Sequence, residues 1–263
     1  MTDATDTCPQ EWIDLAHRLA DIARPIARQY FRTSLSVVSK QDDSPVTIAD
    51  RSIEAAMREE IERTFPDHGI LGEEHGTVRL DAEAVWVLDP IDGTKAFITG
   101  MPSFGTLIAC CVGGRPILGV IDQPIQEERW LGAAGRVSTC NGTEITVSGR
   151  ETLADSVLYA TGPEMFVGTP EEARFARLRD AMRFTRYSGD CYAYGLLASG
   201  YVDLVVEAQL QPYDYCALAP VVEGAGGVIA DWNGAPLTLN SDGRVVAAAS
   251  PALHRAALQR LNS

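Results

Sequence analysis

The chain has 263 residues, of which 46% are hydrophobic and 22% are charged, an ordinary composition for a globular protein. This excludes a disordered or fibrous chain, and no apolar run approaches the length of roughly 18 residues that a membrane span needs. The 36 acidic and 22 basic residues give a net charge of −14, which disfavours nucleic acid and anionic membranes as partners. The length suits one domain that spans residues 1–263.

Six cysteines occur without a Cys-x-x-Cys pair, and two of them are adjacent inside an apolar run. This pattern predicts buried free thiols in a reducing compartment, and therefore a cytoplasmic protein, rather than a disulfide framework or a zinc site.

Helical and strand-like patterns alternate along the whole chain. One-faced apolar spacing predicts helices at 12–31 and 48–65, and Thr47 with Asp50 forms a capping box for the second. Because several predicted strands adjoin without an intervening helix, we expect mixed sheets layered with helices. The remaining predicted elements are strands at 85–88, 104–112, 116–121 and 156–160, helices at 171–182 and 190–199, a strand at 202–207, a helix at 214–222, strands at 227–231 and 245–249, and a last helix capped by Ser250.

The segment from Asp89 to Thr94 carries the strongest chemical signal. It reads Asp-Pro-Ile-Asp-Gly-Thr and directly follows the strand at 85–88. Asp89, Asp92 and the Ile91 carbonyl are hard oxygen ligands of the kind that Mg²⁺ prefers. The amides of Gly93 and Thr94 would face an anion if a helix or turn begins there. An Asx turn would account for a lone pair of aspartates, but the preceding strand and the Gly-Thr pair favour a metal and phosphate site.

Two further acidic segments are weak signals alone. Gly72-Glu73-Glu74 is typical of a solvated loop, and Asp214 in Pro212-Tyr213-Asp214 is typical of a helix N-cap. Together with Asp89 and Asp92 they would form a site of four carboxylates, whose repulsion two or three Mg²⁺ ions would offset. Such a site supports in-line attack of water on phosphorus. The Gly-x-Ser-x-Gly, His-Glu-x-x-His and P-loop motifs are absent from the sequence.

In this order, these three segments resemble the motifs of the inositol monophosphatase-like family of Mg²⁺-dependent phosphatases, and Val46-Thr47-x-x-Asp50 and Gly224-Ala-Gly-Gly227 fit as well. The resemblance covers nearly the whole chain. It implies a mixed α/β fold, a layered αβαβα sandwich of the inositol monophosphatase and fructose-1,6-bisphosphatase type, and a homodimer.

The resemblance also implies roles for particular residues. Glu73, Asp89 and the Ile91 carbonyl would hold the first Mg²⁺, the second would lie among Asp89, Asp92 and Asp214, and a weaker third would contact Glu73. Glu73, Thr94 and Asp50 would act in catalysis, with Asp50 hydrogen-bonded behind Thr94, and no phosphoenzyme would form. Gly93 and Thr94 would bind the phosphate, and Lys40 would lie on a loop that approaches the site.

The run from Arg186 to Tyr194 is similar to the histidinol-phosphatase branch of this family, as are residues 67–74 and 205–208, although Ser188 stands where a second glycine is expected. Asp190 and Glu207 would face the cationic end of L-histidinol phosphate. The expected substrate contacts are Asp92, Arg186, Asp190, Glu207 and Asp214.

Other interpretations of the sequence stay open. Arg186 in a surface ion pair and Glu207 as a solvated strand end are the ordinary roles of such residues. An inositol-1-monophosphatase or a broad-specificity phosphatase of small molecules would share the same chemistry, and a catalytically silent metal- or ligand-binding protein on the same fold is the more distant alternative.

Overall fold

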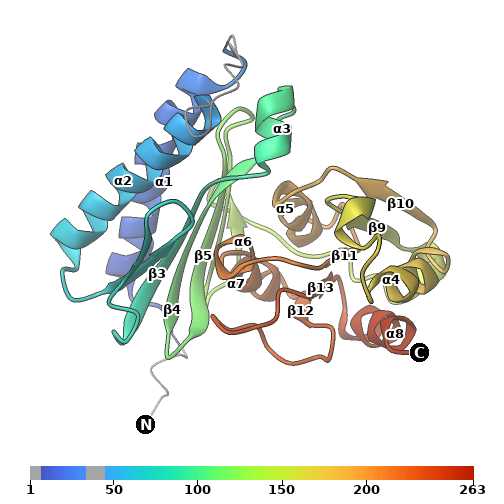
Figure 1. The fold of residues 1–263 in the computed structure, drawn as a ribbon. Coiled ribbons are helices and arrows are strands. Elements are labelled where there is room, and N and C mark those ends of the chain that lie inside the picture. Colours follow the sequence, from blue (N-terminus) through green and yellow to red (C-terminus); the bar gives the residue numbers. More distant parts are fainter. Residues whose placement is uncertain (1–6, 34–44) are drawn as a thin grey trace.

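The computed structural model describes residues 7–33 and 45–263, with side chains from residue 48 onward in the second stretch. Its layers alternate between helices and sheets (Figure 1). The outermost layer on one side holds α1 (Gln10–Tyr30) and α2 (Pro45–Thr64). They cover an eight-stranded mixed sheet of order β2-β1-β3-β4-β5-β6-β7-β8. Its strands are β1 (Gly69–Gly72), β2 (Gly76–Val78), β3 (Ala84–Asp92), β4 (Gly105–Val112), β5 (Arg115–Gln123), β6 (Glu128–Ala133), β7 (Thr139–Cys140) and β8 (Thr143–Glu144).

A second sheet of order β10-β9-β11-β13-β12 lies beyond a middle layer of helices. The middle layer consists of α5 (Tyr192–Ala198), α6 (Pro212–Tyr215) and α7 (Leu218–Gly224), and the far face of the second sheet carries α4 (Glu172–Arg179) and α8 (Pro251–Leu261). The strands of this sheet are β9 (Val157–Ala160), β10 (Phe184–Tyr187), β11 (Leu204–Glu207), β12 (Val228–Asp231) and β13 (Val245–Ala248). Short connecting helices occur at Thr94–Thr99 (α3), Leu153–Asp155 and Pro163–Met165. The predicted αβαβα sandwich is therefore confirmed.

The two-residue period of β3 explains why helices pack on both faces of the first sheet. Trp86 and Leu88 are buried among α1 and α2, whereas Val85 and Val87 belong to the core shared with the middle helices. Successive side chains of a strand point to opposite faces, so an unbroken apolar strand such as β3 needs cover on both sides. A separate core lies between the second sheet and α4 and α8.

Most predicted elements are present with small shifts of their ends. The strands expected at 104–112 and 116–121 are β4 and β5, and the turn between them uses positive φ at both Gly113 and Gly114. Ser250 caps α8 as predicted, since its hydroxyl accepts a hydrogen bond of 3.1 Å from the Leu253 amide. The six cysteines are all free thiols. None of the helices in the described ranges is long and apolar enough to cross a membrane.

Two predictions about elements are wrong, and several short strands were not predicted. Helix α2 begins at Pro45 rather than Ile48, so the backbone of Thr47 lies inside the helix and does not cap it; proline suits the first helical position because its missing amide costs nothing there. The helix expected at 214–222 is broken into α6 and α7. Strands β1, β6 and β10 were not predicted, because their short sequences lack clear alternation of apolar and polar residues.

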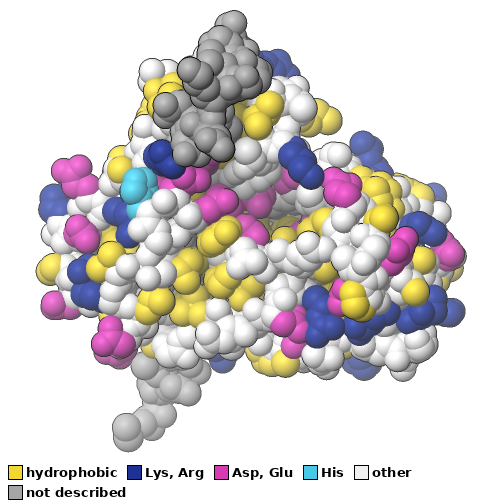
Figure 2. Space-filling view, in the orientation of Figure 1, with side chains coloured by type: hydrophobic (Ala, Val, Ile, Leu, Met, Phe, Trp, Pro, Cys, Tyr) yellow, Lys and Arg dark blue, Asp and Glu magenta, His cyan; other side chains and the backbone are white. Residues whose placement is uncertain are grey.

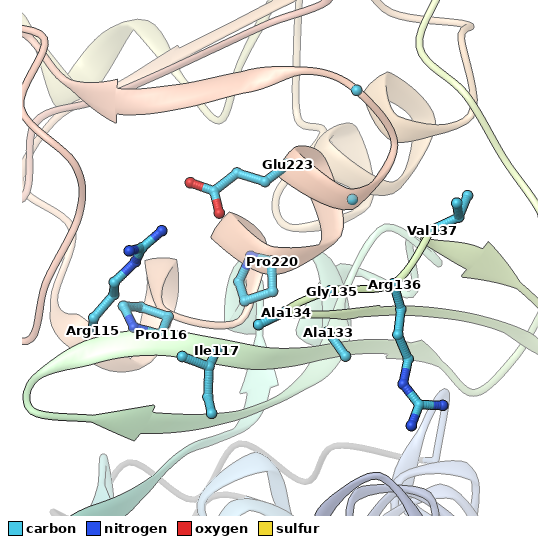
Figure 3. Close-up of a pocket in the computed structure, with 12 residues that line it drawn as sticks. Arg115, Pro116, Ile117, Ala133, Ala134, Gly135, Arg136, Val137, Pro220 and Glu223 are labelled. Atoms are coloured by element: carbon cyan, nitrogen blue, oxygen red, sulfur yellow. The ribbon is translucent and has the colours of Figure 1, made fainter. Parts of the chain in front are cut away.

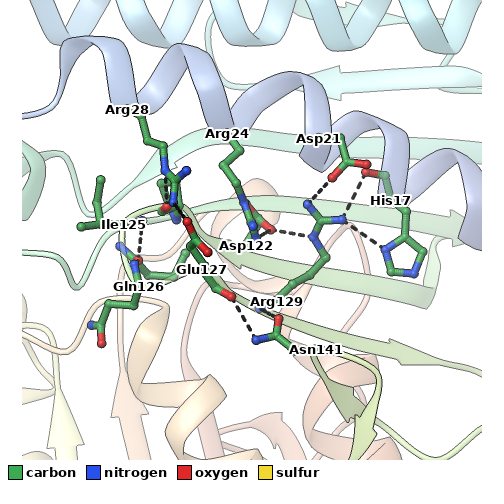
Figure 4. A network of polar contacts seen from close by, with 12 residues as sticks. His17, Asp21, Arg24, Arg28, Asp122, Ile125, Gln126, Glu127, Arg129 and Asn141 are labelled. Carbon is green, nitrogen blue, oxygen red and sulfur yellow. Dashed lines mark hydrogen bonds and ion pairs between the residues drawn. The ribbon is translucent and has the colours of Figure 1, made fainter.

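A buried ionic network fastens α1 to the first sheet (Figure 4). Asp122 on β5 is completely buried, and its carboxylate accepts hydrogen bonds from Arg24 of α1 at 2.6 and 3.1 Å and from Arg129 of β6 at 2.6 Å. Arg129 also bonds Asp21 on α1 at 2.7 Å. One carboxylate on β5 thus joins α1 to β5 and β6.

We expect Asp122→Asn to lower the free energy of unfolding by about 3 kcal/mol, because it removes the buried carboxylate that pairs with both Arg24 and Arg129. Chemical denaturation measures the change. The matched control is Glu127→Gln, since Glu127 pairs with Arg28 at an exposed position and should cost less than about 1 kcal/mol. Equal losses for the two variants would contradict the prediction.

Candidate functional site

Three aspartates meet where β3 ends. Asp89 and Asp92 lie on β3 and Asp214 lies on α6, and one carboxylate oxygen from each lies within 4.8 Å of the other two. Asp214 is oriented by a capping box in which it accepts a 2.7 Å hydrogen bond from the amide of Gln211, the N-cap residue of α6. Asp92 is oriented by a 2.7 Å hydrogen bond from the Cys191 amide. Residues far apart in sequence therefore converge as the sequence predicts.

Glu73 lies beside this trio at the end of the neighbouring strand. The parallel pairing of β1 with β3 matches Gly72 with Leu88, and the Glu73 amide donates to the Leu88 carbonyl at 3.3 Å. The next position on each strand therefore brings Glu73 next to Asp89. Its side chain is exposed at the rim, yet local burial and the negative charge of Asp214 raise the pKa of Glu73 to about 7.

The loop that carries Glu73 is held by Glu54, a buried residue of α2 that sequence reasoning did not identify. The Glu54 carboxylate accepts hydrogen bonds from the amides of Glu74 at 2.7 Å and His75 at 3.1 Å, and from Arg58 at 2.7 Å. A Cβ atom on Gly72 would lie 2.1 Å from the Glu54 carboxylate, so any larger residue there would displace this carboxylate from the loop amides. The spacing of Glu54 and Arg58 by one helical turn was the available signal.

The acids of the site raise each other's pKa values. Burial and the charge of Asp92 raise the pKa of Asp89 well above its usual range, and burial and the charge of Asp214 do the same for Asp92. Burial raises the pKa of Asp214 to about 6. Among the described residues, no arginine or lysine forms an ion pair with Asp89, Asp92 or Asp214. An uncompensated group of carboxylate oxygens at this spacing, one of them from a buried side chain and two from partly buried ones, fits a hard divalent cation such as Mg²⁺.

The end of β3 turns sharply into α3. Gly93 has φ +86°, and a Cβ atom there would lie 2.9 Å from the carboxyl carbon of Asp190. The Thr94 hydroxyl donates to the Ile91 carbonyl at 3.4 Å, and the Ile91 amide donates to Asp89 at 3.0 Å. The sequence suggested either an Asx turn or an acidic site for this segment, and the segment has both.

Asp50 lies on α2, where it is 5% exposed, and its Oδ1 atom has no hydrogen-bond partner within the described part of the chain. Burial, followed by the charges of Glu74 and Glu73, raises the pKa of Asp50 to about 8. The hydrogen bond to Thr94 that the family resemblance implied is not formed, because the Thr94 hydroxyl bonds Ile91 instead.

A cavity of about 250 Å³ opens beside the aspartates. In Figure 2, acidic side chains gather in the hollow between the two halves of the molecule. Besides the partly buried Asp92 and Asp214, two fully buried acids line this cavity, namely Asp190 and Glu207. The further lining residues are Gly93, Thr94, Lys95, Thr161, Met165, Cys191, Tyr194, Leu210 and Leu218.

Asp190 and Glu207 differ in how fully they are hydrogen-bonded. Asp190 accepts one bond, at 2.6 Å from the Ser103 hydroxyl. Glu207 accepts from the Thr161 amide at 2.8 Å, the Thr161 hydroxyl at 2.5 Å and the Tyr194 hydroxyl at 3.0 Å. Asp190 therefore keeps more capacity to accept hydrogen bonds from a ligand than Glu207 does.

The segment before Asp190 has a strained backbone. Ser188 has φ +66° and Asp190 has φ +44°, a conformation that favours glycine. The glycine expected at Ser188 is thus explained by the backbone, and Ser188 adopts the conformation nonetheless, with its amide donating to the Thr161 carbonyl at 2.9 Å.

Arg186, an expected substrate contact, does not line the acidic cavity. Arg186 is exposed on β10, 5.9 Å from the Tyr159 ring, and lines a separate cavity. Among the described residues it forms no ion pair with Asp190 or Glu207. Lys95, which sequence reasoning passed over, lies next to Thr94 and is the one basic residue among those lining the acidic cavity; its Nζ is 3.2 Å from Glu164. Lys40 lies outside the described residues.

Comparisons with known proteins agree with this geometry. The family model of the inositol monophosphatase family matches residues 9–263. The chain is 46% identical to the chloroplastic bifunctional phosphatase IMPL2 of Arabidopsis thaliana, over 99% of this chain and 78% of that protein, and 37% identical to a histidinol-phosphatase of Chlorobaculum parvum, over 89% and 91%. A solved inositol monophosphatase from Zymomonas mobilis superposes with a TM-score of 0.92 at 48% identity, covering 97% of this chain and 98% of that one.

Proposed function

Because the chain belongs to the inositol monophosphatase family, we propose that it is a Mg²⁺-dependent phosphomonoesterase that hydrolyses L-histidinol phosphate to L-histidinol and phosphate. The observation that carries the substrate is the second pair of buried acids, Asp190 and Glu207, in the same cavity as Asp92 and Asp214. Histidinol has an ammonium group and an ionisable imidazole, whereas inositol offers only hydroxyl groups. The histidinol-phosphatase among the relatives supports the same substrate.

Asp89, Asp92, Asp214 and Glu73, with the Ile91 carbonyl, would hold two or three Mg²⁺ ions. When bound, such ions neutralise phosphate charge and lower the pKa of water at the site. The amides of Gly93 and Thr94 orient the phosphate, and the Glu73 carboxylate is placed to accept a proton from the attacking water. The negative charges of Asp50 and Glu73 interact, so Asp50 would influence how tightly Glu73 holds the proton that it accepts.

Direct attack by water is favoured because the cavity offers no activated protein nucleophile among its lining residues. Cys191 is the one thiol there, and burial raises its pKa well above the usual range. A thiol attacks as its thiolate, so Cys191 stays inert. The Thr94 hydroxyl donates to the Ile91 carbonyl and forms no hydrogen bond with a carboxylate of the described residues.

The substrate is tested by steady-state kinetics of the purified chain with Mg²⁺ on L-histidinol phosphate, inositol 1-phosphate and fructose 1,6-bisphosphate. We expect the highest kcat/KM on L-histidinol phosphate. A preference for inositol 1-phosphate would establish the second candidate, which the likeness to the Zymomonas mobilis protein and the three hydrogen bonds already made to Glu207 favour. If the chain hydrolyses no phosphomonoester, the alternative of a catalytically silent binding protein is favoured instead.

Asp190→Asn should reduce kcat/KM for L-histidinol phosphate about tenfold more than for inositol 1-phosphate. The variant keeps the size of the side chain and the contact with Gly93 but removes the charge that would face the substrate's cationic end, a difference of about 1.4 kcal/mol. Ser103→Ala is the control, since it removes the neighbouring hydroxyl and leaves the carboxylate in place. Equal losses on both substrates would refute the role of Asp190.

Lys95→Ala should raise KM for the phosphate substrate about fivefold with little change in stability. Lys95 is the one cation lining an otherwise acidic cavity, and its present pairing with exposed Glu164 is worth less than about 1 kcal/mol. Glu164→Gln releases Lys95 and should leave KM unchanged or lower it. If Lys95→Ala and Glu164→Gln have the same KM, Lys95 does not contact the phosphate.

We further propose a single domain over residues 1–263, a homodimer and a cytoplasmic location. The core shared by both sheets through the middle helices supports one domain, and the free thiols support a reducing compartment. The family resemblance supports the dimer, which sedimentation velocity of the purified chain would test.

A further inference from the structure

The largest of the described cavities lies away from the acidic site and shares no lining residue with it. It has a volume of about 510 Å³ and lies between the start of β5, the end of β6 and the C-terminal end of α7. Gly224 and Gly226 of the Gly-Ala-Gly-Gly segment line it, although that segment takes no part in the proposed phosphatase chemistry. The other lining residues are Arg115, Pro116, Ile117, Ala133, Ala134, Gly135, Arg136, Val137, Pro220 and Glu223.

Two opposite charges project into this cavity from different walls. Figure 3 shows the Arg115 guanidinium and the Glu223 carboxylate directed toward the same space, while the Arg136 side chain points away from them. Among the described residues, neither Arg115 nor Glu223 belongs to an ion pair. Partial burial raises the pKa of Glu223, and the positive charge of Arg115 opposes that rise. The two charges therefore interact electrostatically across the cavity without forming an ion pair.

The wall between these charges is apolar and rigid. Pro116, Ile117 and Ala133 are buried there, and Pro220 faces them from α7. A Cβ atom on Gly132 would lie 2.1 Å from the Pro220 carbonyl oxygen, so β6 and α7 are in backbone contact. Such packing keeps the cavity open without a ligand, and its volume is within the usual range for small-molecule sites.

We propose that this cavity binds a small zwitterion of the α-amino-acid class, with its carboxylate on Arg115, its ammonium on Glu223 and its side chain on the wall of Pro116, Ile117 and Pro220. Arg115 and Glu223 are both exposed at the cavity, so a ligand with one charge would pair with only one of them and gain only one of the two charge-assisted contacts. A polyanion would be repelled by Glu223. A zwitterion satisfies both groups, and the apolar wall accommodates an aliphatic or flat aromatic side chain.

The experiment begins with a thermal-shift screen of the twenty common L-amino acids against the full chain. Mg²⁺ and inorganic phosphate are present at saturation, so that the acidic site is occupied and a failure of the proposed phosphatase function does not alter the result. Isothermal titration then gives Kd for the amino acid with the largest shift, and for two analogues that lack either its amino group or its carboxyl group. We expect saturable binding with one site per chain, and at least about tenfold weaker binding of each analogue.

Variants identify the site. Arg115→Met and Glu223→Gln should each raise Kd at least about fivefold, whereas Arg136→Met, which changes a lining arginine that points away, should leave Kd unchanged. Circular dichroism melts confirm that each variant is folded. The proposal is overturned if no amino acid binds, if a single-charge analogue binds as tightly, or if the Arg115 and Glu223 variants bind like the unaltered chain.

Discussion

Asp92→Asn is expected to lower kcat/KM for the phosphate substrate by about 1,000-fold or more, equivalent to at least about 4 kcal/mol of lost transition-state stabilisation. Asp92 belongs to the trio of carboxylates that would hold the ions, and the amide oxygen of asparagine is a weaker, neutral ligand. The variant keeps an acceptor for the 2.7 Å hydrogen bond from the Cys191 amide, so its geometry should be retained. Steady-state kinetics with Mg²⁺, paired with circular dichroism, measures the effect.

The same substitution should not weaken the metal-free fold. Besides burial, the charge of Asp92 raises the pKa of Asp89, and the charge of Asp214 raises the pKa of Asp92, so removal of the Asp92 charge relieves repulsion and should leave the melting temperature equal or higher. Asp81→Asn is the matched control, because Asp81 is exposed just before β3 and outside the trio; it should keep full activity. More than a tenth of the activity remaining in Asp92→Asn would mean that the trio does not bind the catalytic ions.

The acidic site was predictable because its members are tied to recognisable elements. Asp89 and Asp92 end an apolar strand, and Asp214 opens a helix, so the positions of their backbones follow from hydrophobic patterning and turn chemistry. Their convergence depended on the combined motif set, since each segment alone has an ordinary structural use. The Asx turn at Asp89 is present, whereas the N-cap of α6 is Gln211 rather than Asp214. Asp214 is the third residue of that helix, and its capping-box hydrogen bond orients the side chain rather than competing with the site.

The residues that support the site were not predictable in the same way. Glu54 holds the Glu73 loop through backbone amides twenty residues away, a contact that needs the β1–β3 pairing to be known. From the local sequence, Glu54 lies on a helix that is rich in charged residues. An ordinary ion pair with Arg58, one helical turn away, is then a sufficient reason for a glutamate at this position. Lys95 was hidden for a related reason, since only the fold shows that its side chain turns toward the acidic cavity.

The error at the start of α2 has a local cause. A threonine followed three residues later by an aspartate satisfies the capping pattern wherever it occurs, but Pro45 offers an earlier start that needs no amide partner. With the helix begun at Pro45, Asp50 lies inside it and becomes available to the group of Glu73 and Glu74. Asp50, to which the sequence pattern assigned a capping role, is thereby part of the candidate site.

The metal-free protein should lose stability as the pH rises from about 5 to about 8. Asp214, Glu73 and Asp50 have pKa values raised to about 6, 7 and 8, so in this window the folded state binds more protons than the unfolded state, and the free energy of unfolding falls with increasing pH. A shift of two pKa units corresponds to about 3 kcal/mol. Glu73 is exposed and contributes little, but the shift of Asp214 alone amounts to this much, so we expect a total loss of at least about 3 kcal/mol.

Saturating Mg²⁺ should reverse this loss and should stabilise the protein most at the alkaline end of the window, because carboxylates must be deprotonated to bind the ions. Chemical denaturation at several pH values measures how the free energy of unfolding changes with pH, once in EDTA and once in Mg²⁺. The slope in EDTA should be shallower in Asp92→Asn, which lacks one of the mutually repelling charges, and unchanged in Asp81→Asn. Stability in EDTA that rises with pH over this window would show that these carboxyl groups are ionised without cations, and the acidic group would then need another explanation than a site built for divalent metal.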